Sequence, residues 1–436
     1  VYENYNLGIL TSSNSVSYII DMELNNSKLT ADKITVKSGS NGTITINELN
    51  GLNITQDNLK NLITNSASVK ILYKENASDS IRLALSKSIT DKYNQTISLP
   101  TYFNTTSNSY KVNYDDFIGD IGITLTNNAD TITFGVISVR DTLAATNQYT
   151  PSASDEQKDR YFILPENITY SVTENTGTTG KVGIMYVQGG NNSIIDYQNT
   201  YSGFDVQAGA ILDISNIQFR NAISNSKGGI INNSGIVGAT TISGINNSSF
   251  INNTAIMGGA IYNIGTIYSI ANTNFTENIV TSSRESTYGG AIYNTGTIGR
   301  IENVTFTQNK AVSSQYAYGG AIYNTGNIEY ISASFIGNYT VGTNVFGGAI
   351  YSSNNLKLIA NNQDFMFKDN YTQSTSTGSI EDNAIYMSSY QSILTIEANN
   401  GGSWTLYDSI NGARGYTVTL LSTEGRGTIN LFNQIY

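Results

Sequence analysis

The strongest constraint on the fold is a sequence motif that returns along the middle of the chain at nearly constant spacing. The motif Gly-Gly-Ala-Ile-Tyr-Asn, or a variant of it, starts at Gly228, Gly258, Gly289, Gly319 and Gly347, with 28 to 31 residues between starts. A second motif, Phe-x-x-Asn, runs in phase with the first and starts at Phe250, Phe275, Phe306, Phe335 and Phe367. Two motifs in phase over at least four copies indicate a repeat architecture.

The content of one repeat predicts short β-strands. Ala260 to Asn263 is β-prone and is followed by the turn residue Gly265, and no stretch suits a long amphipathic helix. Asn and Gly at the turns suit left-handed backbone conformations. A unit of about 30 residues with three short strands cannot bury a hydrophobic face alone, but it can when stacked on its neighbours. The sequence therefore predicts an all-β fold, a parallel β-helix (β-solenoid), over most of the chain, with a few short helices and loops.

Stacking of the turns predicts rows of equivalent side chains, because each strand pairs with its counterpart about 4.8 Å along the axis. We expect three buried structural rows, namely Ile261, Ile292, Ile322 and Ile350; Asn263, Asn294 and Asn324 as an amide ladder; and Phe275, Phe306 and Phe335. Strand alternation then turns Ala260 and Tyr262 outward. The candidate binding surface is an exposed aromatic row formed by Tyr262, Tyr293, Tyr323 and Tyr351.

The regularity of the repeats divides the chain into four segments. We expect an irregular β-rich part over residues 1–148, a loop and the first coils over 149–204, the regular β-helix over 205–400, and C-terminal coils over 401–436. Within the first half, Gln56–Ile63 and Val139–Ala145 are predicted as short helices. Tyr149–Asp159, with Pro151 and mixed charges, is predicted as a protruding loop or linker.

Composition excludes several classes of chemistry. The 436 residues carry 23 Lys and Arg against 33 Asp and Glu, a net charge of −10, which argues against nucleic acid as a partner. Without Cys or His, the chain has no disulfide, thiolate nucleophile, His-based triad or His-ligated metal. We expect no cofactor and no metal. No apolar run approaches the roughly 18 residues of a membrane span, so none is expected.

The two motifs also carry a family resemblance. Gly-Gly-Ala-Ile followed by Phe-x-x-Asn resembles the paired motif of the chlamydial polymorphic membrane proteins, and it recurs in many autotransporter passengers. The runs Gly401–Gly412 and Gly427–Leu431 look like passenger sequence as well. The resemblance is specific over residues 205–436 and suggestive over 1–204. It implies a secreted, right-handed parallel β-helix on a Gram-negative surface, with adhesive or structural duties. The chain differs from the chlamydial members in lacking Cys.

Other patterns allow a functional interpretation, but a structural one is favoured for each. The Gly-Gly pairs could cradle a phosphate, yet a strand follows them where such a loop needs a helix. The Asn side chains could bind sugar, but internal stacking is preferred. Two groups of carboxylates are interpreted as surface charge, not as a hydrolase pair or a calcium loop: Asp196, Asp205 and Asp213 near Arg220, and Asp115, Asp116 and Asp120.

These observations predict a non-enzymatic structural or adhesive protein (an adhesin) of the bacterial outer surface or extracellular space, or a module of a surface fibre assembled end to end. The alternative is a glycan-binding or glycan-cleaving β-helix of the tailspike or pectinase type. Expected partners are another copy in head-to-tail contact or the rest of a longer chain, or glycans and proteins on host or neighbouring cells. The fibre hypothesis rests on β-prone, nearly uncharged ends, Val1–Tyr5 and Ile429–Phe432.

Overall fold

The computed structural model describes residues 4–50, 68–85, 108–125, 131–137, 143–148 and 160–436, with further gaps of one to three residues. The chain divides into two compact units. The first comprises Val1–Thr142, Lys158–Tyr170 and Gln188–Ser193, and the second comprises Leu143–Gln157, Ser171–Val187 and Ile194–Tyr436. The helix predicted at Gln56–Ile63 and the loop predicted at Tyr149–Asp159 lie outside the described residues. The helix α3 (Leu143–Asn147) overlaps the one predicted at Val139–Ala145.

The first unit contains two stacks of parallel strands and one antiparallel sheet. The parallel stacks are β1 (Asn4–Leu7), β4 (Lys33–Val36) and β7 (Leu72–Lys74), and β2 (Ser15–Asn25), β5 (Thr43–Asn50) and β8 (Arg82–Leu85). The strand β3 (Lys28–Ala31) runs antiparallel to β2. The antiparallel sheet has the order β6 (Ser68–Lys70), β11 (Thr131–Ile137), β10 (Phe117–Leu125), β9 (Asn108–Tyr114). The strand β12 (Arg160–Leu164) also belongs to this unit, whereas the residues of β13 (Thr169–Ser171) and β15 (Ile184–Gly189) are divided between the two units. The predicted alternation holds in β4, where Ile34 and Val36 are buried.

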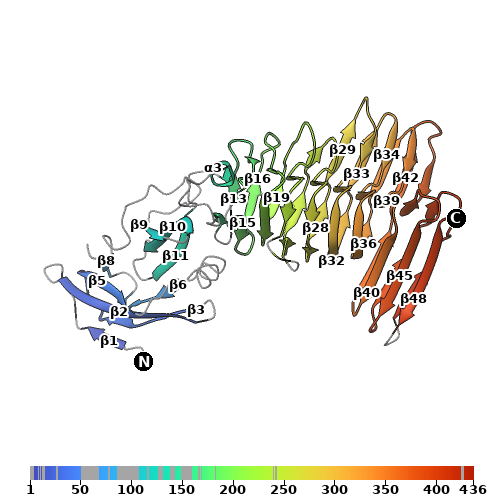
Figure 1. The fold of residues 1–436 in the computed structure, drawn as a ribbon. Helices are drawn as coiled ribbons and strands as arrows, with labels where there is room; N and C mark the ends of the chain where they lie inside the picture. Colours follow the sequence, from blue (N-terminus) through green and yellow to red (C-terminus); the bar gives the residue numbers. More distant parts are fainter. Residues whose placement is uncertain are drawn as a thin grey trace. The chain divides into compact units, whose positions relative to one another are not determined.

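The second unit is a parallel β-solenoid whose turns contribute strands to separate sheets (Figure 1). The sheet of the Ile-Tyr-Asn strands is β14 (Gly177–Thr178), β17 (Phe204–Val206), β20 (Ile231–Asn233), β25 (Ile261–Asn263), β31 (Ile292–Asn294), β35 (Ile322–Asn324), β39 (Ile350–Ser352), β44 (Ile385–Met387) and β47 (Ile410–Gly412). A second sheet is β24 (Thr254–Ala255), β29 (Ile279–Ser282), β33 (Lys310–Ser313), β37 (Tyr339–Gly342), β42 (Tyr371–Ser374) and β43 (Ile380–Asp382). A smaller sheet is β30 (Thr287–Tyr288), β34 (Tyr316–Tyr318) and β38 (Asn344–Phe346).

The remaining strands form the broadest face, which carries the Phe-x-x-Asn motif. They are β16 (Ile194–Asp196), β18 (Ile211–Ser215), β19 (Gln218–Arg220), β21 (Ile236–Val237), β22 (Ile245–Asn246), β23 (Ser249–Ile251), β26 (Thr266–Ile267), β27 (Ile270–Ala271), β28 (Asn274–Thr276), β32 (Thr297–Thr307), β36 (Asn327–Ile336), β40 (Leu356–Asn361), β41 (Asp364–Lys368), β45 (Ile393–Asn399), β46 (Ser403–Leu406), β48 (Thr417–Thr423) and β49 (Thr428–Leu431). The three short strands β26, β27 and β28 all pair with β32, so in the turns of β32 and β36 this face is formed by one long strand.

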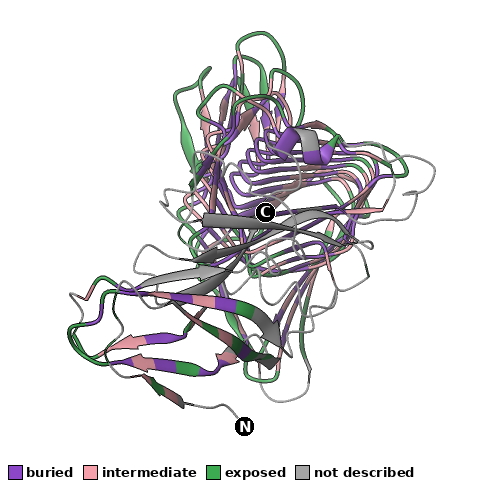
Figure 2. Ribbon diagram, turned by 90° about the vertical axis from the view of Figure 1, so that its left-hand side faces the viewer, coloured by how far each residue is buried: buried purple, intermediate pink, exposed green. Residues whose placement is uncertain are grey.

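The predicted β-solenoid is confirmed, with about 11 turns over most of the chain. Buried residues follow the strands of the coil, and many exposed residues lie in the loops that connect the strands (Figure 2). Each turn places its residues directly beside their counterparts in the next, as Ile261, Ile292 and Ile322 do. The core is therefore a set of rows along the axis, each built from one position of the repeat.

The Gly-Gly pairs form the corner before each Ile-Tyr-Asn strand. Gly289 has φ +65°, and a Cβ on Gly290 would lie 2.0 Å from the carbonyl oxygen of Gly320. Gly289 must be glycine because its backbone is left-handed, and Gly290 must be glycine because the next turn approaches it closely.

The expectation that Ala260 faces outward is wrong. Ala260 and its counterparts are fully buried at the same corner. The backbone N–H groups of both Ala260 and Ile261 donate to the carbonyl of Ala291, at 3.0 and 2.9 Å. Ala260 therefore lies in the turn before β25 begins, where the alternation of a strand does not apply.

Candidate binding surface

The repeated motif residues build the inside of the helix. The Ile row from Ile231 to Ile385 and the Phe row from Phe219 to Phe367 are 0% exposed. Neighbouring Phe rings from Phe250 to Phe367 stack at 4.7–4.9 Å. The strand partner of Phe367 in the next turn is Leu406, and the Phe367 ring also stacks on Trp404 at 5.7 Å. Parallel rings at one strand spacing fill the core without voids, so these rows stabilise the fold and leave no room for a ligand.

Asn263, Asn294 and Asn324 lie in an amide ladder inside the helix. The side-chain Nδ2 of Asn233 donates to Oδ1 of Asn263 at 2.7 Å, and the series continues through Asn294 and Asn324 to the hydroxyl of Ser352. The four Asn side chains are fully buried. Because each amide bonds to the next, none of them is available to a sugar outside.

A second ladder is formed by the Asn of Phe-x-x-Asn, which sequence reasoning did not place. Asn253, Asn278, Asn309, Asn338 and Asn370 are fully buried, and each Nδ2 donates to the next Oδ1 at 2.9 Å. Each Oδ1 from Asn278 onward also accepts the backbone N–H of the preceding Asn. The Asn of the motif was the sequence signal for this ladder. A polar residue at a fixed position after a buried Phe needs a hydrogen-bond partner inside the fold.

This second ladder ends on a carboxylate. Oδ2 of Asp408 accepts both the backbone N–H and the Nδ2 of Asn370, at 3.0 and 2.7 Å. Asp408 is 5% exposed, and burial raises the pKa of its carboxyl although the bonds from Asn370 act in the opposite direction. A carboxyl group therefore stands where the other turns hold a neutral amide.

We expect Asp408→Asn to stabilise the fold at neutral pH. The Asn oxygen keeps both bonds from Asn370, and its Nδ2 can donate to the carbonyl of Phe367, as the amides of earlier turns donate to Phe306 and Phe335. The pKa of the Asp408 carboxyl is higher in the folded chain than in the unfolded chain. The stability that this carboxyl contributes is therefore fully present below the unfolded pKa, near 3.9. It is lost as pH rises through the folded pKa. Melts between pH 3 and pH 7 should show the variant's advantage growing with pH. A constant difference would contradict this.

The Tyr row lies on the outside of the same strands as the buried Ile row. Tyr262, Tyr293, Tyr323 and Tyr351 stack with ring centroids 4.7–5.1 Å apart, and Tyr386 extends the row. The prediction of an exposed row is wrong at Tyr262, which is 7% exposed and lies under the ammonium group of Lys227, 4.5 Å from its ring. The other three are half-buried.

A second aromatic row covers one side of the Tyr row. Tyr288, Tyr318 and Phe346 stack on one another at 5.2 Å in the smaller sheet. Their rings meet the Tyr row edge to face, with Tyr288 against Tyr323 and Tyr318 against Tyr351, both at 4.9 Å. The sequence contained a signal for this row, since an aromatic residue stands directly before Gly289, Gly319 and Gly347. We call the two rows together the aromatic face.

Three tyrosines of the aromatic face, Tyr293, Tyr318 and Tyr323, have a raised pKa. Burial, reinforced by neighbouring tyrosines, raises the pKa of Tyr318 to about 12 and raises the pKa of Tyr323 further. The pKa of Tyr293 is raised for the same reasons. At physiological pH the face is therefore neutral and presents flat apolar edges with O–H donors, which suits protein or sugar partners.

The three carboxylates near Arg220 that were considered for catalysis do not form a cluster of three acidic groups in the structure. Asp196, Asp205 and Asp213 lie on three successive strands of one turn, β16, β17 and β18. Burial would raise the pKa of Asp196, but hydrogen bonds from Gln198, Asn221 and Arg220 lower it, and Arg220 bonds it at 2.8 Å.

The other two carboxylates of this group have structural surroundings. Oδ1 of Asp205 accepts the side-chain N–H of Asn232 at 2.9 Å. The interpretation as surface charge is wrong for Asp213, which is only 8% exposed. Asp115, Asp116 and the side chain of Asp120 lie outside the described residues. Across the described part of the chain, no group of three acidic residues is placed to hold a metal ion. No helix in that part of the chain has the length and apolar character needed to cross a membrane.

Comparison with known families agrees with the motif pattern. A family model described as the Chlamydia polymorphic membrane protein repeat matches residues 303–325. This stretch holds one Phe-x-x-Asn, at Phe306, and one Gly-Gly-Ala-Ile, at Gly319. Together with the solenoid, the match makes the chain a β-helix similar to those proteins, and the resemblance is to a membrane- or surface-associated family. No curated protein and no solved structure matches the chain.

Proposed function

We propose that the protein is a non-enzymatic adhesin of the bacterial outer surface, a rigid β-helix that presents side chains in rows to glycans or proteins on host or neighbouring cells. The observation that carries this proposal is the arrangement of each turn. The Ala, Ile, Phe and Asn positions of the motifs, such as Ile292, Asn294 and Phe306, are buried, and the Tyr position between them lies outside in register. Repetition therefore builds the scaffold, and the outer positions are free to carry recognition.

The aromatic face is the surface we assign to adhesion. Half-buried tyrosines held on both sides by their neighbours lose little conformational entropy when a partner docks, which is why rigid aromatic residues are favoured at interfaces. The face is uncharged, so recognition there depends on shape, apolar contact and hydroxyl hydrogen bonds.

A variant series tests this surface. We expect the triple variant Tyr293→Ser, Tyr323→Ser and Tyr351→Ser to lose saturable binding of labelled chain to cultured epithelial cells, measured by flow cytometry. The matched triple Tyr→Phe variant keeps the packing and isolates the hydroxyl groups. Far-UV circular dichroism must be unchanged for the comparison to count. Wild-type binding by both variants would remove the aromatic face from adhesion, and no saturable binding by the wild type to any cell type would overturn the proposal.

The same samples separate the other hypotheses. Sedimentation velocity over a concentration series tests end-to-end assembly, which predicts particles that lengthen with concentration. Release of reducing ends from neutral or acidic polysaccharides tests the glycan-cleaving alternative. Hydrolysis needs two carboxyl groups about 5–9 Å apart, and the separated surroundings of Asp196, Asp205 and Asp213 support the non-enzymatic proposal.

A further inference from the structure

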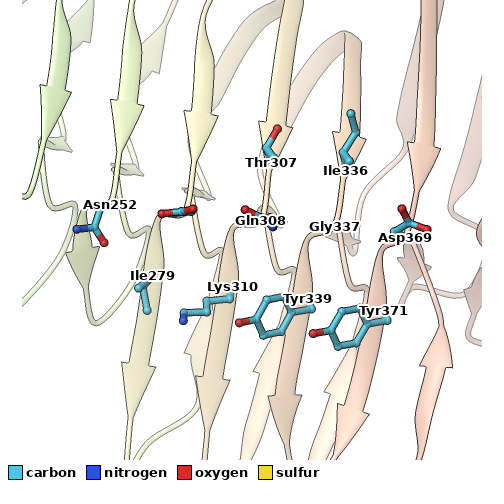
Figure 3. A pocket seen from close by; sticks show the side chains of 11 residues that line it. Asn252, Ile279, Thr307, Gln308, Lys310, Ile336, Gly337, Tyr339, Asp369 and Tyr371 are labelled. Carbon is cyan, nitrogen blue, oxygen red and sulfur yellow. The ribbon is translucent and has the colours of Figure 1, made fainter.

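A groove of about 630 Å³ runs along the helix beside the second Asn ladder. One wall carries Thr307 and Ile336, and the other carries Lys310, Tyr339 and Tyr371 (Figure 3). The groove exists because the residue before each ladder Asn turns the chain in left-handed conformation. These residues are Asn252, Glu277, Gln308, Gly337 and Asp369, with φ between +53° and +64°. Five equivalent positions make the groove long, about 19 Å at one strand spacing per turn.

The groove combines an aromatic wall with charged groups that form no ion pair among the described residues. Tyr339 and Tyr371 are half-buried, and their rings are parallel at 4.9 Å, side by side in Figure 3. Nζ of Lys310 lies 6.0 Å from the Tyr339 ring. Among the described residues, no ion pair involves Glu277, Lys310 or Asp369. Charges that form no ion pair in a long concave site are available to a ligand.

The groove has a notch at Gly337, the fourth of its five left-handed positions. It is the only glycine among the five left-handed positions, and a Cβ there would meet nothing closer than Cγ of Gln308, at 3.5 Å. The side chains present in the other turns are missing here, directly beside Tyr339. A ligand unit can therefore approach the backbone at this point while it contacts the aromatic wall.

We propose that this groove binds a neutral, extended oligosaccharide along the helix axis. Successive turns repeat at a spacing comparable to the length of one pyranose unit in an extended chain, so one row of side chains meets one row of sugars. Aromatic rings offer apolar surface to sugar C–H groups, and the carboxylates, the ammonium and the amide of Gln308 offer hydrogen bonds to hydroxyl groups. Two carboxylates against one ammonium disfavour a polyanion.

The site is suited to binding and not to cleavage. Glu277 and Asp369, the two carboxylates that line it, stand three turns apart, which is about 14 Å along the axis. Glycoside hydrolysis requires a pair no more than about 9.5 Å apart. This inference does not depend on the aromatic face, whose residues lie on other sheets.

Titration calorimetry with defined hexasaccharides tests the groove. We expect the extended, neutral chitohexaose or cellohexaose to bind, and the curved maltohexaose and a sulfated heparin hexasaccharide to bind at least about tenfold more weakly. Tyr339→Ser should weaken binding about tenfold. Gly337→Asn should abolish it by filling the notch, without backbone strain, because Asn252 already occupies the equivalent left-handed position. Tyr330→Ser, on β36 outside the groove, is the matched control and should bind as the wild type does.

Three outcomes would overturn the proposal. The first is no binding of either extended neutral probe at millimolar concentration. The second is binding that survives both Tyr339→Ser and Gly337→Asn, and the third is preference for the sulfated probe. Because the epithelial-cell assay relies on the aromatic face, its failure and failure of the groove are separate results.

Discussion

Replacing Ile292 with aspartate should destabilise the helix far more than replacing its neighbour Tyr293 with serine. Ile292 is 0% exposed and lies between Ile261 and Ile322 in the buried row. The carboxylate would have no hydrogen-bond donor there, and the lost side chain would leave a cavity, so we expect a cost of at least about 4 kcal/mol.

Tyr293→Ser is the matched control on the same strand. Tyr293 is half-buried and stacks on Tyr262 and Tyr323, so its loss should cost only about 2 kcal/mol. Urea unfolding of both variants, followed by circular dichroism, measures the two free energies. A larger loss for Tyr293→Ser would mean that the inside and outside of β31 are assigned the wrong way round.

The interior of the fold could be predicted because the same residue types recur at the same positions of successive turns. A residue type that recurs at one position of every turn must pack against itself, so Ile261, Ile292 and Phe306 could be placed inside before any coordinates. The second Asn ladder follows from the same reasoning, and it was missed only because Asn309 was considered as part of a motif and not as a buried polar group that needs a partner.

The outside of the fold could not be predicted in the same way. Alternation placed Tyr262 correctly on the outer side of its strand, but it said nothing about Lys227 from the preceding turn or the strands β30, β34 and β38 that cover the row. The aromatic residues of those strands recur directly before Gly289, Gly319 and Gly347, but the rest of these stretches differs from turn to turn. Coverage of a surface depends on such contacts between turns, which a one-dimensional pattern does not contain.

The groove was hidden for a related reason. Its residues occupy the x positions of Phe-x-x-Asn and the position after the Asn. Glu277, Gln308, Gly337 and Asp369 stand at the same position of successive turns but are four different residue types. What they share is a left-handed backbone, which Asn and Gly suggest but Glu and Gln do not. Only the coordinates show that these unlike side chains form one surface.

Directed cross-linking tests the central claim, that the repeats stack turn on turn in one register. Because the chain has no Cys, a disulfide within it can form only between the two cysteines that are introduced. Thr276 and Thr307 are partners on β28 and β32. Neighbouring strands lie about 4.8 Å apart, which is within the Cα separation of a disulfide. Lys368 stands in the same row two turns beyond Thr307, through Ile336.

The account predicts that Thr276→Cys with Thr307→Cys forms an intramolecular disulfide on mild oxidation, seen by mass spectrometry of the unreduced, denatured chain. Thr276→Cys with Lys368→Cys, about 14 Å apart, should form none. No bond in the first pair, or bonds at equal rates in both, would contradict the stacking of the repeats and with it every row described above.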